Sequence, residues 1–239
     1  MPNSRAFVIK SLKNGETSLI VSCYLEDIGF KTFIVKGVYG SKKSKFSKAH
    51  FFPLNIININ YSFMEGRNLG FIKEVKTEKL YNSLHSDIQK SSVIIFLSEI
   101  LNNIFKEETT VNKDLFTFLL NTFSWYDEVK SCNSFHIKFL IELSRFIGFY
   151  PNINNKNDSF FNLESGSTSE VQTIGNDIKG NDLKLFKEFL GTEFEDLNNM
   201  NIKNESRNRI LNYIIEYYSL HLQTFKTPKS INVFADIFK

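Results

Sequence analysis

Residues 6–25 read AFVIKSLKNGETSLIVSCYL, two runs rich in β-branched and aromatic residues on either side of Asn14-Gly15. An Asn-Gly pair between two such runs is a strong signal for a tight β-hairpin. Three further runs of this kind follow, at residues 31–38, 54–61 and 69–75. Five short strands in fewer than 80 residues favour a five-stranded Greek-key barrel of the OB (oligonucleotide-binding) type, although an SH3-like barrel would give a similar pattern.

From about Leu80 the hydrophobic period changes from two towards 3.6, which predicts helices. The expected helices cover residues 88–105, 114–126, 134–147, 182–190 and 207–225, with a last short turn of helix at 231–238. We therefore predict an α+β protein of several domains, with an OB-fold barrel in residues 1–80 and an all-helical domain in residues 81–239.

Residues 152–180 interrupt the helical pattern with a polar excursion rich in Asn, Ser, Gly and Thr. Its few apolar residues predict a hairpin with residues 159–163 and 171–174 as its arms. Asn181 is the expected N-cap of the helix that follows, because Asn is among the residues favoured at that position.

The charge is divided unevenly along the chain. Residues 1–80 hold 13 Lys and Arg against 6 Asp and Glu, a net charge of +7, whereas residues 81–239 hold 16 against 20, a net of −4. Between Ile28 and Met64 there are six lysines and no acid. A positive surface confined to one domain indicates a polyanionic partner, and nucleic acid is the commonest.

Several function classes find no support in the sequence. No run of apolar residues approaches the ~18–20 needed to cross a membrane, and the N-terminus lacks an apolar signal segment. Cys23 and Cys132 are not in CxxC spacing, which is typical of buried free thiols in a reducing cytosol. The four histidines have no metal-ligand spacing, and no Walker A loop or catalytic pair of residues stands out. We expect a cytoplasmic protein that is not an enzyme.

The order and spacing of several short motifs are more specific than composition. They are Ala6-Phe7-Val8-Ile9-Lys10, Gly15-Glu16-Thr17-Ser18-Leu19-Ile20, Gly29-Phe30, Val35-Lys36-Gly37, Ser41-Lys42-Lys43-Ser44, Phe52-Pro53-Leu54, Phe96-Leu97-Ser98-Glu99-Ile100-Leu101 and Gly148-Phe149-Tyr150-Pro151. In this order the motifs closely resemble the RecO family of bacterial DNA repair and recombination mediators. The resemblance extends over nearly the whole chain, with a gap at residues 152–180.

The resemblance implies a non-catalytic, nucleoid-associated protein that responds to DNA damage. Members of the family bind single- and double-stranded DNA and anneal complementary strands. With RecR they help to load recombinase onto strands coated by single-stranded DNA-binding protein. Many relatives also carry a four-cysteine zinc site after the Gly-Phe-x-Pro turn, but residues 152–180 contain neither cysteine nor histidine. We therefore expect no metal and no cofactor.

The candidate DNA-binding residues lie in and around the basic run. They are Lys36, Lys42, Lys43, Lys45 and Lys48, with Tyr39 as the better stacking candidate and Arg67 as a possible extension. Lysine suits contact with the phosphate backbone because it is a long-reaching point charge that does not read sequence. The alternative is a solvated loop with no ligand. Phe46 is a second stacking candidate. For both Tyr39 and Phe46 the alternative is packing under the loop, and Phe33 is expected to be core.

The remaining candidate site comes from the resemblance. Relatives bind the acidic, Phe-terminated tail of single-stranded DNA-binding protein in an apolar pocket edged with basic side chains. Lys138 and Phe139 fall at the corresponding basic-aromatic step. The alternative is that Phe139 is core and Lys138 a solvated helix residue. For the whole protein, the alternative to a mediator is an OB-fold adaptor that binds protein or RNA through its helical domain, with DNA contact incidental.

Overall fold

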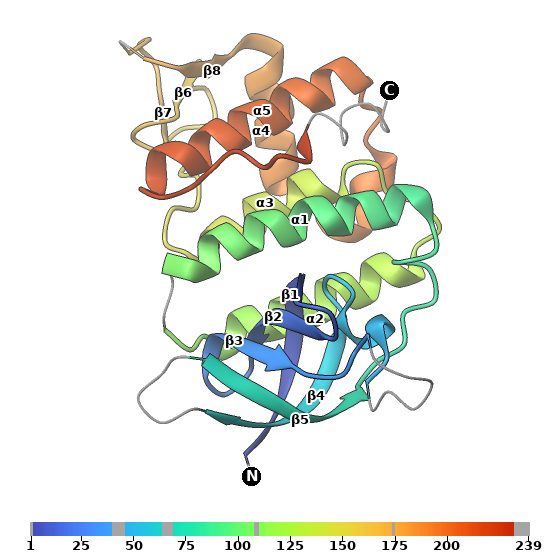
Figure 1. Ribbon diagram of the computed structural model, residues 1–239. Coiled ribbons are helices and arrows are strands. Elements are labelled where there is room, and N and C mark those ends of the chain that lie inside the picture. Colours follow the sequence, from blue (N-terminus) through green and yellow to red (C-terminus); the bar gives the residue numbers. More distant parts are fainter. Residues whose placement is uncertain (1, 40–45, 64–68, 108–109, 174, 232–239) are drawn as a thin grey trace. The chain divides into compact units, whose positions relative to one another are not determined.

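The computed structural model describes residues 2–39, 46–63, 69–107, 110–173 and 175–231 (Figure 1). The chain divides into two compact units, residues 1–128 and residues 129–239. The lysines Lys42, Lys43 and Lys45, Arg67 and the predicted turn at 231–238 fall outside the described residues, apart from Ile231.

The first unit is built on a closed five-stranded barrel. Its strands are β1 (Asn3–Asn14), β2 (Ser18–Leu25), β3 (Gly29–Val35), β4 (Ile56–Phe63) and β5 (Leu69–Thr77). Neighbours follow the order β1-β2-β3-β5-β4, and β4 pairs with β1 to close the barrel. The pairing of β3 with β5 is parallel and all other pairings are antiparallel. This topology confirms the predicted OB-type barrel over the SH3-like alternative.

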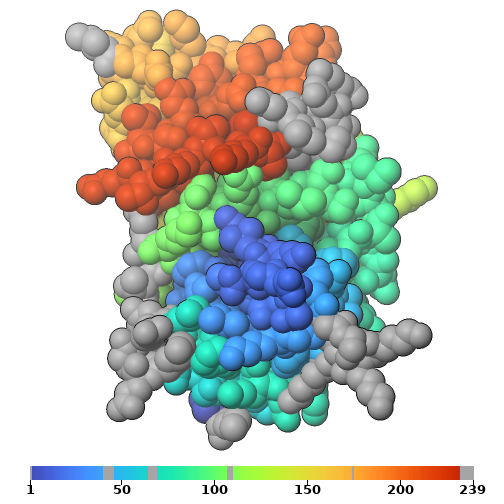
Figure 2. Space-filling view, viewed as in Figure 1, coloured from blue at the N-terminus to red at the C-terminus, as the bar shows by residue number. Residues whose placement is uncertain are grey.

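The turns act as the sequence predicts. Gly15 has φ +63° between β1 and β2, a left-handed conformation that glycine adopts without steric cost. The barrel interior is filled by apolar side chains from all five strands, and Phe33 is fully buried among them, as expected. Figure 2 shows the barrel residues, blue to teal, forming one continuous surface.

Two helices complete the first unit, α1 (Ile88–Glu107) and α2 (Lys113–Glu128). Aromatic rings join them to the barrel: Phe7 lies 5.1 Å from Phe116, and Tyr24 stacks on Phe105 at 4.3 Å between ring centroids. The compact unit therefore extends to Glu128. The domain boundary expected at residue 80 stays a prediction.

Asp127 anchors the segment that leads from the barrel to α1. Its carboxylate accepts hydrogen bonds from the backbone N–H groups of Asn82, Ser83 and Leu84, at 2.8, 2.8 and 3.0 Å. The buried Lys90 ammonium donates to the Ser83 hydroxyl and to the Asp127 carbonyl. These bonds fix the start of α1 against the end of α2.

The second unit combines helices with a small sheet. Its described elements are α3 (Phe135–Phe146), β6 (Phe160–Asn162), β7 (Ser167–Ser169), β8 (Asp177–Lys179), α4 (Gly180–Gly191), the 3-10 helix η2 (Phe194–Asn199) and α5 (Asn204–His221). Strand β6 is the middle strand and pairs antiparallel with β7 and β8. Within the described ranges, no helix is both long and apolar enough to cross a membrane.

Two local predictions in the second unit are wrong. The hairpin partner of β6 is 167–169 rather than 171–174, because Gly166 at φ +64° and the Asn162 side chain, which accepts from the Ser165 N–H, make the turn earlier. Helix α4 starts at Gly180 with Lys179 as the preceding residue, so Asn181 is not its N-cap.

Candidate nucleic-acid interface

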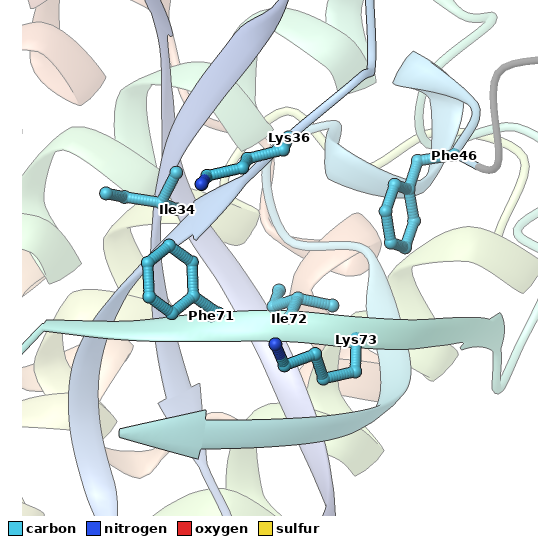
Figure 3. Close-up of a pocket in the computed structure, with 6 residues that line it drawn as sticks. All are labelled: Ile34, Lys36, Phe46, Phe71, Ile72 and Lys73. Carbon is cyan, nitrogen blue, oxygen red and sulfur yellow. The ribbon is translucent and has the colours of Figure 1, made fainter. Parts of the chain in front are cut away.

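The barrel has a cleft where the end of β3 faces β5. It has a volume of about 250 Å³ and is lined by Ile34, Lys36, Phe46, Phe71, Ile72 and Lys73 (Figure 3). The β3–β5 pairing joins Thr32–Ile34 to Leu69–Phe71, and the last pair, Ile34 and Phe71, lines the cleft. Strand alternation explains the lining: Ile72 points into the barrel core, whereas Phe71 and Lys73 turn outward.

The ring of Phe71 lies between two ammonium groups. Lys36 Nζ is 5.2 Å and Lys73 Nζ is 5.4 Å from the ring centroid, within cation–π range. Phe71 is half-buried and both lysines are exposed, so the ring and the charges are accessible together. A half-exposed aromatic ring flanked by cations suits a nucleic acid strand, because the ring stacks on a base and the cations bind phosphates.

A second basic-aromatic cluster forms around Tyr39. Lys48 Nζ lies 4.0 Å and Lys13 Nζ 5.4 Å from the centroid of the Tyr39 ring, which packs partly against the barrel core. Lys48 begins the short 3-10 helix η1 (Lys48–Phe51). Tyr39 therefore lies within cation–π range of two lysines.

The predicted DNA-binding residues divide into three groups. Lys36 lies in the cleft, and Lys48 and Tyr39 form the second cluster. The loop lysines and Arg67 lie outside the described residues, so their role stays a prediction. Phe46 is 7% exposed and belongs to the barrel core, with its ring 6.4 Å from that of Phe51, which corrects its proposed stacking role.

The sequence interpretation missed Phe71, Lys73 and Lys13. Phe71 and Lys73 are two residues apart on a strand, a spacing that places both side chains on one face. That signal was available, but the 25 phenylalanines of the chain hide which rings are outside. Lys13 is found only through the β1–β2 pairing, which places it opposite Leu19, near the residues that follow β3.

Lys138 and Phe139 lie on α3 in the second unit and are both buried. Lys138 Nζ donates to the Glu142 carboxylate at 2.8 Å and to the Phe189 carbonyl at 3.2 Å. The ammonium is therefore already occupied inside this unit. Tail docking at these residues stays a prediction, and it requires the lysine to leave both partners.

Hydrogen bonds between side chains order the described residues of the polar segment, 152–173 and 175–180. The Asn162 amide donates to Thr173 and Asp177, and the Thr168 hydroxyl donates to Asp158 at 2.5 Å. Burial alone would raise the pKa of Asp177, but bonds from Thr173 and Asn162 hold it below its ordinary value. In the described ranges, no group of three or more His, Cys, Asp or Glu side chains is placed to hold a metal ion.

The chain matches two family models and several curated proteins. The model "Recombination protein O N terminal" matches residues 1–81, and "Recombination protein O C terminal" matches residues 85–230. A protein of Flavobacterium psychrophilum named DNA repair protein RecO is 35% identical over 235 residues, 98% of each chain. Proteins of the same name from Christiangramia forsetii and Phocaeicola vulgatus are 35% and 32% identical, over 99% and 97% of this chain and 98% and 96% of their own.

Proposed function

The chain belongs to the RecO family, and on that premise we propose that it is a DNA repair and recombination mediator. It binds single- and double-stranded DNA without sequence specificity and anneals complementary strands. With RecR it helps to load recombinase onto strands coated by single-stranded DNA-binding protein. Its action is binding rather than catalysis, on nucleoid DNA in the cytoplasm.

The observation that carries this proposal is the cleft, where Phe71 lies between Lys36 and Lys73. Lysines bind phosphate as point charges and carry no sequence information. An aromatic face stacks on any base, because every base has a π-face. The pair of contacts thus supports binding to strands of any sequence, which annealing requires.

Contact with the tail of single-stranded DNA-binding protein is proposed at Lys138 and Phe139. Glu142 is the internal counterion of Lys138, so an acidic tail competes with a carboxylate that is already in place. Arg145 also contacts Glu142, at 3.3 Å, and would keep that carboxylate paired while the lysine turns to the tail. If Lys138 moved from Glu142 to the tail in this way, neither carboxylate would be left without a cationic partner.

The first experiment measures annealing of two complementary labelled oligonucleotides at ~50 and ~200 mM salt. The strands are tested both naked and coated with the cognate single-stranded DNA-binding protein. Because single strands lose about 0.7 of log affinity per log salt for each phosphate contact, ~4–6 contacts give a slope of about −3 to −4. The variant Lys36→Ala/Lys73→Ala should weaken binding and make this slope shallower by about 1.4.

The matched control is Lys184→Ala/Lys203→Ala, which removes the same charge from exposed positions in the second unit. It should leave the salt slope unchanged. A folded wild-type protein that neither binds nor anneals naked strands would overturn the mediator proposal in favour of the adaptor. An equal loss in both double variants would instead assign binding to net charge and remove the cleft from the proposal.

A further inference from the structure

A second pocket of the first unit lies at the other end of β5. It has a volume of about 210 Å³, and its wall includes His50, Phe52, Lys79, Leu80, Tyr81 and His85. These residues come from η1, from the turn after it and from the segment that leads to α1. None of them belongs to the cleft between β3 and β5.

Aromatic rings form one side of this pocket. The ring of His85 lies 5.8 Å from that of Phe52 and 5.9 Å from that of Tyr81. His85 Nε2 donates to the Pro53 carbonyl at 2.9 Å, which fixes the ring in place. Phe52 is 48% exposed and Leu80 is 81% exposed, so the mouth of the pocket is lined by solvent-exposed apolar side chains. A flat apolar ligand that covers this rim removes apolar surface from water, which favours binding.

Two buried polar atoms of the lining residues have no hydrogen-bond partner in the described part of the chain, His50 Nδ1 and the Tyr81 hydroxyl oxygen. Burial raises the pKa of Tyr81, so its hydroxyl keeps its proton and can donate. An unpaired buried polar group is costly. Both atoms are closed to solvent, so a ligand that opens the pocket far enough to reach them with the donors and acceptors of its edge would relieve that cost. A nucleobase has such an edge, whereas an aliphatic peptide side chain does not.

The pocket also lies within reach of a strand held in the cleft. Lys73 lines the cleft and Thr77 lines the pocket, four residues apart on β5 or about 13 Å at 3.3 Å per residue. That distance equals about four stacked nucleotides at 3.4 Å each. Lys79 Nζ is 6.0 Å from the Tyr81 ring and 4.0 Å from the exposed Glu128 carboxylate, so a phosphate beside the pocket would compete with that carboxylate for the lysine.

We propose that this pocket receives one unstacked base of a single strand whose backbone lies in the cleft. The inference rests on the proposed DNA-binding function and adds a stacking site to it. The base lies against the Phe52 and His85 rings, with its edge towards Tyr81 and His50. Holding a base out of its stack presents the neighbouring nucleotides to an incoming complementary strand.

The test compares two oligonucleotides of the same length, a (dT)12 strand and the corresponding abasic strand, by fluorescence anisotropy. Phe52→Ala should weaken (dT)12 binding roughly 5- to 150-fold, because stacking on an aromatic ring is lost. It should leave the affinity for the abasic strand and the salt slope unchanged, since no phosphate contact is removed. Tyr81→Phe, which removes only the hydroxyl, should give a smaller loss, again confined to the strand with bases.

The control is Leu12→Ala, which truncates an apolar side chain of similar exposure on β1, outside the pocket. It should affect neither strand. Equal binding of (dT)12 by Phe52→Ala and wild type would overturn the pocket inference and leave cleft binding intact, as expected if the pocket takes a peptide side chain. Equal weakening for both strands would overturn it too, by assigning Phe52 a structural role. A wild type that binds neither strand would overturn the DNA-binding proposal itself.

Discussion

Replacing Asp127 by alanine should destabilise the first unit strongly, because one carboxylate satisfies three backbone N–H groups. Each hydrogen bond to a charged group contributes about 1.5–3 kcal/mol, and the three are not additive. Asn82 is exposed and its N–H can bind water instead, whereas Leu84 is fully buried. The variant leaves the buried Leu84 N–H without an acceptor and removes the negative charge near Lys90. We therefore expect the free energy of unfolding to fall by about 3–5 kcal/mol.

The assay is urea unfolding followed by circular dichroism, with Asp87→Ala as the matched control. The Asp87 carboxylate accepts one bond from the Lys90 N–H at the start of α1, at 2.9 Å, and such a cap contributes about 1 kcal/mol. Asp127→Ala should therefore lower the unfolding free energy several times more than Asp87→Ala. Equal losses in the two variants would refute the assignment of Asp127 as the anchor of this segment.

The same carboxylate predicts a pH dependence. Burial alone would raise the pKa of Asp127, but hydrogen bonds from the N–H groups of Asn82, Ser83 and Leu84 outweigh burial and hold it below its ordinary value. A depressed pKa gives stability that is present above the unfolded value of about 3.9 and is lost as pH falls through the folded value. Wild type should lose stability below about pH 4–5 more steeply than Asp127→Asn.

Three further predictions concern the interior. Gly70→Ala should cost about 1–3 kcal/mol in urea unfolding, because the new Cβ would lie 2.6 Å from a Phe33 ring carbon; an unchanged midpoint would mean that the ring moves freely. Lys138→Ala should lower the free energy of unfolding by about 3–5 kcal/mol, since the buried ammonium donates to Glu142 and to a carbonyl. An unchanged free energy of unfolding would mean that these bonds do not stabilise the fold and that the lysine can turn to a partner. Burial raises the pKa of the Cys23 thiol, so Ellman's reagent should modify it at pH 8 only after unfolding, and rapid reaction of the native protein would contradict its burial.

Local signals in the sequence were enough to predict the barrel and the helices. The Asn14-Gly15 turn and the evenly spaced β-rich runs depend on interactions between near neighbours, and α1 and α2 match their predicted ranges within two residues. Strand β7, Ser167–Ser169, was missed because it contains no apolar residue and owes its pairing to β6. Short polar strands are decided by their partners rather than by propensity.

The candidate site was predictable in its charge but not in its geometry. The acid-free lysine run indicated the barrel as the candidate domain for binding a polyanion, and Lys36 lines the cleft, where its role stays a prediction. Phe71 could not be singled out among the many phenylalanines, because composition does not show which face of a strand is exposed to solvent. The burial of Lys138 depends on the Phe189 carbonyl, 51 residues away, and no local pattern reveals such a partner.

Among the described strand pairings of the barrel, the one between β3 and β5 is the shortest. The β3–β5 pairing comprises three residue pairs and is parallel, a geometry slightly less stable per residue than the antiparallel one. The cleft straddles that pairing, with Lys36 on one side and Lys73 on the other. A polyanion that contacts both lysines would hold the two strands together. Amide hydrogen exchange in β3 and β5 should therefore be slower when the polyanion is bound. The bound ligand would then stabilise the β3–β5 pairing, and the barrel without ligand would open there more often.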